Sequence, residues 1–466
     1  MVGRTHEIGL LEATLSSDKA ELIAIYGRRR VGKTFLVRQF FENRICFEVT
    51  GLFQGGMVDQ LANFTKELDK RTSTNNKKPT NWLDAFTLLE QHIDSLSNEG
   101  KKVIFIDEFP WMATKRSKFL MAFANFWNSY SEKRADLIVV ICGSAASYMV
   151  QKIIRNKGGL HNRISQKIRL LPFNLQETEL FLKSRNIDLT RYDILQLYMA
   201  VGGVPHYLEK VQRGKSVAQN LDRMCFEKDG VLSDEFNLLF ASLFDDSDKH
   251  KAIIRALANT RKGLTRDGII EKSGLPSGGD LSLKLMELIE SGFVTEYPYF
   301  QNKAKQILYR LSDEYSLFYL KFMENGKHNG SGTWLNLQTS QSYVSWSGFS
   351  FEGLCLKHVH QLKKGLQIQA IRSESSSWFN ENAQIDLVID RADNIINLCE
   401  MKFANSPFTI DKTYAQNLRN KISEFKNSSG TRKGTHLVMV TTFGTKENPY
   451  SLELVQNDLK MDCLFE

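Results

Sequence analysis

The chain has 466 residues, which suggests about three domains at roughly 150 residues each. Hydrophobic residues make up 42% and charged residues 24%, and 30 Phe stand against 8 Pro, so the composition excludes long disorder. No run of about 18 apolar residues predicts a membrane span, and the first residues contain no signal-peptide core. The six cysteines form no CxxC pair, which argues against a zinc ribbon or a disulfide scaffold. We therefore expect a cytoplasmic protein.

The net charge of +8 is unevenly distributed along the chain. Residues 101–170 contain 13 basic and 4 acidic residues, whereas residues 341–466 contain 14 of each. The basic segment is compatible with a phosphate or nucleic-acid partner, and a solvated face without any partner fits it equally well.

The first half of the chain alternates strands and helices. Residues 21–42 read as a strand (ELIAIY), a Gly-rich turn (GRRRVGKT) and a helix (FLVRQFF). A helix near Trp82–Ser97 precedes two continuous apolar runs, VIFIDE at 103–108 and LIVVICG at 137–143. Such runs are typical of parallel strands covered on both faces, so the sequence predicts a layered α/β core.

Three segments of different character follow this core. Helical spacing from about 174 to 240, broken at GGVP (202–205), predicts a helical lid. Residues 248–323 read as three helices and a two-stranded hairpin, the order of a winged helix-turn-helix. The stretch 325–350 is rich in Gly, Ser, Asn and Gln and is predicted to be a linker.

The last segment has the order αβββαβ. A helix (SFEGLCLKHVHQLKK) precedes predicted strands at about 367–372, 385–390 and 395–403. A helix at about 410–426 and a final strand, HLVMVTTF, complete it. The predicted domains are a core at 1–170, a lid at 171–245, a winged helix at 246–325, a linker at 326–348 and a C-terminal domain at 349–466.

Residues 27–34 fit GxxxxGK[ST] and lie between a strand and the start of a helix. Gly27 and Gly32 let backbone N–H groups surround the β-phosphate, Lys33 reaches the β- and γ-phosphates, and the Thr34 hydroxyl binds Mg²⁺. The pattern therefore predicts an ATP site. The expected nucleotide-binding residues are Gly27, Arg30, Val31, Gly32, Lys33, Thr34, Asp107 and Ser144.

An acidic pair ends the strand at 103–108, as a phosphate loop requires. Asp107 is expected to hold Mg²⁺ through water, and Glu108 to polarise the attacking water. Ser144 ends the next strand, where it either contacts the γ-phosphate or caps the following helix. Arg163 is a candidate arginine finger, in cis or in trans, although one Arg in a basic segment is also expected on a plain surface.

Six blocks in order resemble the archaeal-type ATPase family, P-loop proteins of the AAA+/STAND group. They are VGRxxE at 2–7, YGRRRVGKT, FIDEFPW, the GSA strand end, RISxKIxLxPF and GGVPHYL, spanning about residues 1–240. The resemblance implies an AAA-like fold, ATP as ligand, a VGR segment close to the adenine, and a lid whose Gly202-Gly203-x-Pro205 element lies near the nucleotide. Members of this family often also carry a winged helix and a C-terminal nuclease-like domain of unresolved function.

The predicted winged helix is poorly charged for reading DNA. Its third helix carries one Lys against several carboxylates, namely Asp280, Glu287 and Glu290. Lys303 and Lys305 are basic residues of the predicted wing. We favour domain packing or a protein partner, with DNA contact as the alternative.

The C-terminal segment contains Asp386 and, fourteen residues later, Glu400-x-Lys402. A hairpin would bring Asp386 close to Glu400, and period 2 places Lys402 on the same face as Glu400. Two carboxylates can bind Mg²⁺, and the lysine can orient water. Glu352, in the preceding helix, could add a carboxylate.

This D…ExK pattern on an αβββαβ order resembles the PD-(D/E)XK nuclease family over about residues 345–445. The family often has Pro before the Asp, where this chain has Ile385. Gln416 matches a position that is polar in some relatives. The expected catalytic residues of the whole chain are Glu108, Arg163, Glu352, Asp386, Glu400 and Lys402, and the expected metal ligands are Thr34, Asp107, Asp386 and Glu400.

Two hypotheses remain open at this stage. In the first, the nucleotide state of an ATPase regulates a Mg²⁺-dependent nuclease domain that acts on nucleic acid, on DNA before RNA. In the second, the chain is a nucleotide-dependent signalling or scaffolding switch with an inert C-terminal domain and protein partners. Oligomerisation is compatible with both.

Overall fold

The computed structural model describes residues 1–72, 76–97, 100–155, 158–244, 246–260, 262–300, 307–326 and 330–466. The chain divides into two compact units, Met1–Leu171 and Pro172–Glu466. Among the residues described, no helix is both long and apolar enough to cross a membrane.

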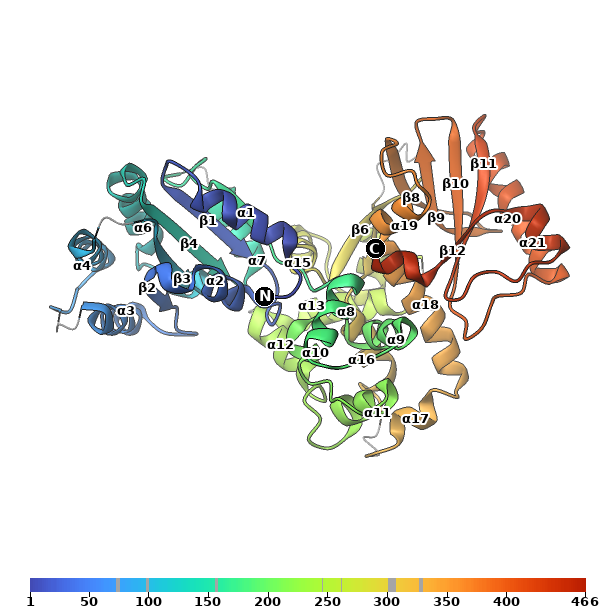
Figure 1. Ribbon diagram of the computed structural model, residues 1–466, viewed down its shortest axis with the longest axis horizontal. Coiled ribbons are helices and arrows are strands. Elements are labelled where there is room, and N and C mark those ends of the chain that lie inside the picture. Colours follow the sequence, from blue (N-terminus) through green and yellow to red (C-terminus); the bar gives the residue numbers. More distant parts are fainter. Residues whose placement is uncertain are drawn as a thin grey trace. The chain divides into compact units, whose positions relative to one another are not determined.

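The first unit is a parallel sheet between two layers of helices (Figure 1). The strand order is β2-β3-β4-β1-β5, and every neighbouring pair is parallel. The elements are α1 (Thr5–Leu15), β1 (Glu21–Tyr26), α2 (Lys33–Phe41), η1 (Glu42–Arg44), β2 (Ile45–Thr50), α3 (Met57–Thr72), α4 (Trp82–Ser95), β3 (Lys102–Asp107), α5 (Phe109–Met112), α6 (Phe119–Ser129), η2 (Ser131–Lys133), β4 (Leu137–Gly143), α7 (Ala146–Tyr148), η3 (Met149–Ile154) and β5 (Gln166–Arg169).

Continuous apolar strands produce this sandwich. All residues of β3 and β4 are buried, because each strand has helices on both faces. Alternate residues of β1 enter two cores: Leu22 and Ala24 pack with α3, α4 and α6, and Ile23 and Ile25 pack with α1 and α2. Parallel strands end at one edge of the sheet, so the segments after β1, β3 and β4 meet there.

The second unit combines many helices with two antiparallel or mixed sheets. Its elements are α8 (Leu175–Ser184), α9 (Arg191–Val201), α10 (Pro205–Leu208), α11 (Val217–Leu221), η4 (Asp222–Phe226), α12 (Glu235–Leu243), α13 (Ser247–Ala258), α14 (Arg266–Ser273), α15 (Gly279–Glu290), β6 (Val294–Pro298), β7 (Ile307–Leu311), α16 (Glu314–Phe322), α17 (Thr333–Leu337), α18 (Gln341–Lys357), α19 (Val359–Gly365), β8 (Ser373–Phe379), β9 (Gln384–Arg391), β10 (Ile395–Lys402), α20 (Lys412–Ser429), β11 (Gly434–Thr441), α21 (Pro449–Leu454), β12 (Val455–Lys460) and η5 (Met461–Phe465).

The larger sheet has the order β12-β11-β10-β9-β8. Strands β8, β9 and β10 are antiparallel neighbours, and β10, β11 and β12 are parallel. The helix α20 connects the parallel pair β10 and β11. The smaller sheet is the antiparallel pair β6–β7, which follows the helices α13, α14 and α15.

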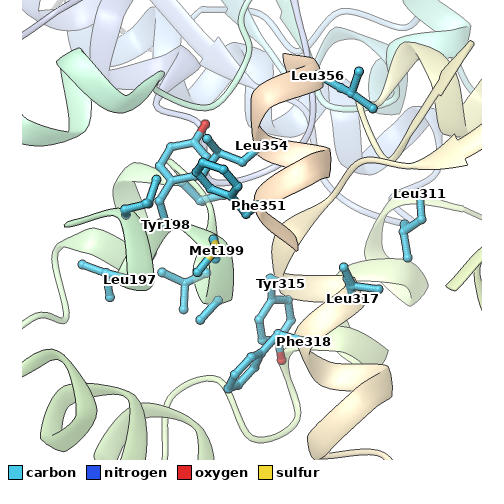
Figure 2. Packing of buried hydrophobic residues seen from close by; sticks show 14 of the residues in the cluster. Leu197, Tyr198, Met199, Leu311, Tyr315, Leu317, Phe318, Phe351, Leu354 and Leu356 are labelled. Carbon is cyan, nitrogen blue, oxygen red and sulfur yellow. The ribbon is translucent and has the colours of Figure 1, made fainter. Parts of the chain in front are cut away.

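The main apolar core of the second unit contains residues from Phe173 to Phe465, and two smaller clusters pack between the C-terminal sheet and its neighbours. Figure 2 shows part of the main core, where side chains of α9 (Tyr198), α16 (Tyr315, Phe318) and α18 (Phe351, Leu354) lie together. The helices after the ATPase sheet and the C-terminal sheet are therefore parts of one cooperative body.

Two sequence predictions are wrong in this unit. The predicted linker 326–348 is, over its described part, mostly helical and packed: Trp334 is 1% and Trp346 is 3% exposed. The polar composition of this stretch predicted a linker, although it contains two tryptophans that are buried in the core. The predicted strand at 367–372 is displaced to Ser373–Phe379, because residues 366–371 form turns after α19, and Gln367 has a φ of 58°.

Candidate functional site

The Gly-rich loop 27–32 connects β1 to α2, and Gly32 caps the N-terminus of that helix. Gly27 has a φ of 149°, and a Cβ atom there would overlap the backbone carbonyl oxygen of Leu170. Only glycine allows the loop to pass so close to the end of β5. Arg30 has a φ of 71°, and Val31 is buried.

Lys33 points back into its own loop. Its Nζ donates to the carbonyl oxygens of Gly27 and Arg28, both at 2.8 Å, and to Ser144 Oγ at 3.0 Å. The side chain is buried, and this burial lowers the pKa of Lys33, while nearby negative groups including Glu108 oppose the shift. An ammonium that is desolvated and held by carbonyls is a ready donor for phosphate oxygens.

The hydroxyl of Thr34 lies beside the end of β3. Thr34 Oγ1 donates to Asp107 Oδ2 at 2.7 Å, and Asp107 is 5% exposed. A hydroxyl and a carboxylate are hard oxygen ligands, so these two residues fit a Mg²⁺ ion bound together with nucleotide phosphates.

Both carboxylate oxygens of Glu108 are held by Ser144. The Ser144 hydroxyl donates to Oε1 at 2.6 Å, and its backbone N–H donates to Oε2 at 3.1 Å. Glu108 has a φ of 44°, a strained conformation at the strand end. Ser144 does not cap a helix, because Ala145 precedes α7. Its side chain joins Lys33 to Glu108 instead.

Two further arginines have defined partners. Arg4 is buried, and its Nη2 donates to the carbonyl oxygen of Val31 at 3.1 Å, so the N-terminal segment is tied to the phosphate loop. Arg163 forms an ion pair with Glu132, and both side chains are about two-fifths exposed, at 41% and 39%. Arg163 is therefore engaged in a surface pair.

The second candidate site lies on β9 and β10. The antiparallel register pairs Cys399 with Leu387, so Glu400 and Asp386 follow as neighbours on the two strands. Asp386 Oδ2 accepts the backbone N–H of Met401 at 2.9 Å. Asp386 is 9% and Glu400 1% exposed, so two carboxylates are desolvated side by side.

Cations and a phenol surround Glu400. Lys421 Nζ donates to Oε1 at 2.6 Å, and the Tyr414 hydroxyl donates to Oε2 at 3.2 Å. Lys402 Nζ lies 3.6 Å from Oε2. Burial, and then the charge of Asp386, raise the pKa of Glu400, and burial together with Glu400 raises the pKa of Tyr414.

Glu352 of α18 belongs to the same electrostatic group. Burial, and then the charge of Asp386, raise its pKa to about 7. However, Glu352 forms a buried ion pair with Arg310 of β7. Within the described part of the chain, no three His, Cys, Asp or Glu side chains gather so that they could hold a metal ion. Asp386 and Glu400 offer suitable oxygens, but the third carboxylate does not join them, and the acidic site as arranged does not fit a fully ligated metal.

Sequence reasoning missed the partners of these carboxylates. Tyr414 and Lys421 are seven residues apart on α20, and the apolar positions Leu418 and Phe425 of the same helix mark the face toward the sheet. That spacing is the signal that could have found them. Gln416 lies on the exposed face of α20. No pattern in the sequence around Arg310 predicts that it pairs with Glu352.

Two carboxylates of the predicted DNA-reading helix, α15, pair with residues of α13. Glu287 binds His250 Nε2 at 2.7 Å, and Asp280 binds Lys249 at 3.0 Å. Lys303 and Lys305 lie outside the described residues.

Comparison with known proteins agrees with the nucleotide site. Residues 1–211 match an ATPase domain found predominantly in Archaea, and residues 319–418 match a family of archaeal and bacterial proteins of unknown function. An uncharacterized protein of Methanocaldococcus jannaschii is 26% identical over 390 residues, which is 83% of each chain. An uncharacterized ATP-binding protein of the same organism is 51% identical over 43 residues, covering 9% of this chain and 73% of that protein.

Among solved structures, the Walker-type ATPase of Pyrococcus abyssi has a TM-score of 0.49 at 16% identity, covering 69% of this chain and 96% of its own. A STAND protein with a tetratricopeptide repeat sensor from Pyrococcus horikoshii has a TM-score of 0.31 at 18% identity, covering 79% and 52%. The geometry around Lys33 and the family match over residues 1–211 lead to one conclusion: this part of the chain carries a P-loop ATPase domain of the type found predominantly in Archaea.

Proposed function

We propose that the chain is an ATP-hydrolysing switch whose nucleotide state regulates a C-terminal, divalent-cation-dependent nuclease site acting on nucleic acid. The observation that carries the ATPase part is the 2.7 Å contact between Thr34 Oγ1 and Asp107 Oδ2, with the Lys33 ammonium held in the adjacent loop. These are the groups that phosphates and Mg²⁺ require, placed at one edge of the sheet.

Each residue has a defined task in hydrolysis. Lys33 would exchange its loop carbonyls for phosphate oxygens, and Thr34 and Asp107 would hold a Mg²⁺ ion, whose charge would neutralise that of the phosphates. Glu108 accepts one hydrogen bond from Ser144 on each oxygen, and the remaining lone pairs of the carboxylate are available to orient a water. Arg163 would have to leave Glu132 to act as a finger on the phosphates.

The nuclease part rests on the C-terminal sheet. A helix, three antiparallel strands, a helix and a parallel strand occur in the order shared by PD-(D/E)XK nucleases. Asp386 and Glu400 are neighbours on β9 and β10, and Lys402 lies beside Glu400. Paired carboxylates with an ammonium suit the chemistry of a phosphodiester. We propose that residues 246–325 contact protein rather than DNA, because the carboxylates of Asp280 and Glu287 on α15 are paired with residues of α13.

Two assays test the proposal. Lys33→Ala should abolish ATP binding, and Glu108→Gln should bind ATP but not turn it over. In the cleavage assay, the wild type and the Glu400→Ala protein are each incubated with nucleic acid and Mn²⁺ or Mg²⁺, with and without ATP. The substrates are single-stranded, duplex and branched DNA, and RNA. Cutting by the wild type alone supports the nuclease, and ATP dependence supports the coupling. Unchanged ATP affinity in Lys33→Ala would contradict the nucleotide assignment.

A signalling switch with an inert C-terminal domain is the second candidate. It is favoured by the pairing of Glu352 with Arg310 and of Glu400 with Lys421, which satisfies the carboxylates within the protein. Absence of cutting in every nucleotide state, with ATP turnover intact, would support this alternative.

A further inference from the structure

Two loops of the ATPase unit enclose a hollow of about 540 Å³, a volume typical of ligand sites. One loop follows β2 and runs from residue 51 to the start of α3. The other, residues 113–118, follows α5. The described lining of the hollow contains Trp111, Lys115 and Arg116 and no carboxylate. The hollow therefore combines an aromatic ring with positive charge.

A buried amide ties the first loop to α5. Gln60, which is 0% exposed, accepts the Leu52 N–H at 2.9 Å and donates to the Trp111 carbonyl oxygen at 3.1 Å. The backbones also meet directly, since a Cβ atom on Gly51 would lie 2.6 Å from the carbonyl oxygen of Glu108. The fold thus fixes the walls of the hollow, so a ligand there finds them already in place.

An exposed phenyl ring lies beside the hollow. Phe53 is 55% exposed, and its ring centre lies 5.3 Å from that of Trp111 at an interplanar angle of 60°. The guanidinium carbon of Arg29, in the phosphate loop, lies 5.2 Å from the centre of the Trp111 ring. Trp111 is thereby held in place, and Phe53 offers more than half of its surface to a further flat ring.

The loop 113–118 adds cations that the protein does not pair. Its sequence, ATKRSK, contains Lys115, Arg116 and Lys118 and no acidic residue, and all three side chains are exposed. Among the described residues, no carboxylate forms an ion pair with any of them. Arg116 and Lys118 have φ values of 66° and 55°, in the left-handed region that long side chains seldom adopt. Such backbone strain clusters at functional sites.

We propose that this surface binds single-stranded nucleic acid: a base stacks on Phe53, and Lys115 and Arg116 contact the phosphates beside it. Aromatic rings flanked by cations hold single strands without reading their sequence, because every base has a flat face. The inference goes beyond the proposed function, since these residues belong to the ATPase unit and not to the C-terminal site. It also gives part of the basic excess of residues 101–170 a partner.

Fluorescence anisotropy tests the stacking contact with labelled oligothymidine and oligouridine of about 20 nucleotides. The full-length, nucleotide-free protein is used in EDTA, which prevents metal-dependent cleavage. Phe53→Ala and Phe53→Leu should each weaken binding about tenfold or more, and Phe53→Trp should retain it. Phe35→Ala is the matched control and should bind as the wild type does, because Phe35 is 60% exposed and lies on α2, outside the lining. Duplex DNA should not distinguish Phe53→Ala from the wild type, since its bases are already stacked.

The salt dependence of binding tests the phosphate contacts. Lys115→Gln combined with Arg116→Gln should lower the slope of log affinity against log salt by about 1.4, because each phosphate contact to a single strand contributes about 0.7. Lys77→Gln combined with Lys78→Gln removes the same charge from exposed residues outside the hollow and should leave the slope unchanged.

Equal binding of both oligonucleotides by the wild type and Phe53→Ala would refute the inference. Full affinity in Phe53→Leu would also refute it, and would indicate a surface for an apolar or acidic peptide. Binding that depends on Phe53, in a protein that cuts no nucleic acid, would keep this inference and refute the nuclease. Cleavage lost in Glu400→Ala, with no effect of Phe53 on binding, would refute this inference and keep the nuclease.

Discussion

His358 is a buried imidazole that joins the end of α18 to the start of α8, and acid should weaken this joint. Its Nδ1–H donates to the Leu354 carbonyl oxygen at 2.8 Å, and its Nε2 accepts the Leu175 N–H at 3.3 Å. These contacts fix the neutral tautomer, because a proton on Nε2 would face an N–H group. Burial lowers the pKa of His358 from 6.5 to about 4.

Proton binding at His358 sets the direction in which the free energy of unfolding changes with pH. Between pH 6.5 and about 4 the unfolded chain binds a proton at His358 and the folded chain does not, so the free energy of unfolding rises with pH. The full difference is about 3 kcal/mol, of which about 2 kcal/mol is lost on going from pH 7 to pH 5. Glu352 acts oppositely: its folded pKa is raised to about 7, so its contribution is lost as pH rises through that value.

Because these two effects overlap, the measurement compares variants. Urea unfolding at pH 7 and pH 5 is followed for the wild type, for His358→Gln and for His360→Gln, an exposed control two residues away. The wild type and the control should lose about 2 kcal/mol more than His358→Gln between the two pH values. Equal pH dependence in all three proteins would refute the claim that the imidazole is held neutral.

Three substitutions probe other features. Gly27→Ala should lower ATP affinity by about tenfold or more, because its Cβ meets backbone, whereas Gly9→Ala, with open space around it, should leave affinity unchanged; isothermal titration decides. Thr34→Ala should weaken ATP binding in the presence of Mg²⁺ but not in EDTA, and Thr34→Ser should restore it; equal losses in both buffers would contradict the ligand role. Trp334→Ala should destabilise the protein by about 3–5 kcal/mol, and Leu335→Ala, 48% exposed, should cost little in the same thermal melts.

Local chemistry made the ATPase core predictable. The order of strand, Gly-rich turn and helix at 21–42 depends on residues that are next to one another in the sequence. The apolar runs form β3 and β4, and every residue of these two strands is buried. The proximity of Asp386 to Glu400 also followed from a short hairpin.

Long-range partners were not predictable. Arg310 and Glu352 are 42 residues apart, and nothing around either residue indicates the other. The polar stretch that contains Trp334 resembled a linker because composition averages over residues, whereas the fold depends on two rings that pack against distant aromatic side chains such as Phe226 and Phe318.

The main apolar core of residues 172–466 also constrains how such a protein can be shortened or recombined. The match to the ATPase family ends at residue 211, inside that core, where Val211 is 5% exposed. A protein ended there would leave α9 without α16 and α18, its packing partners, and would expose their shared apolar surface to aggregation. Exchange of the C-terminal part between relatives therefore requires a cut near residue 171, so that the helices after that residue and the C-terminal sheet are inherited together.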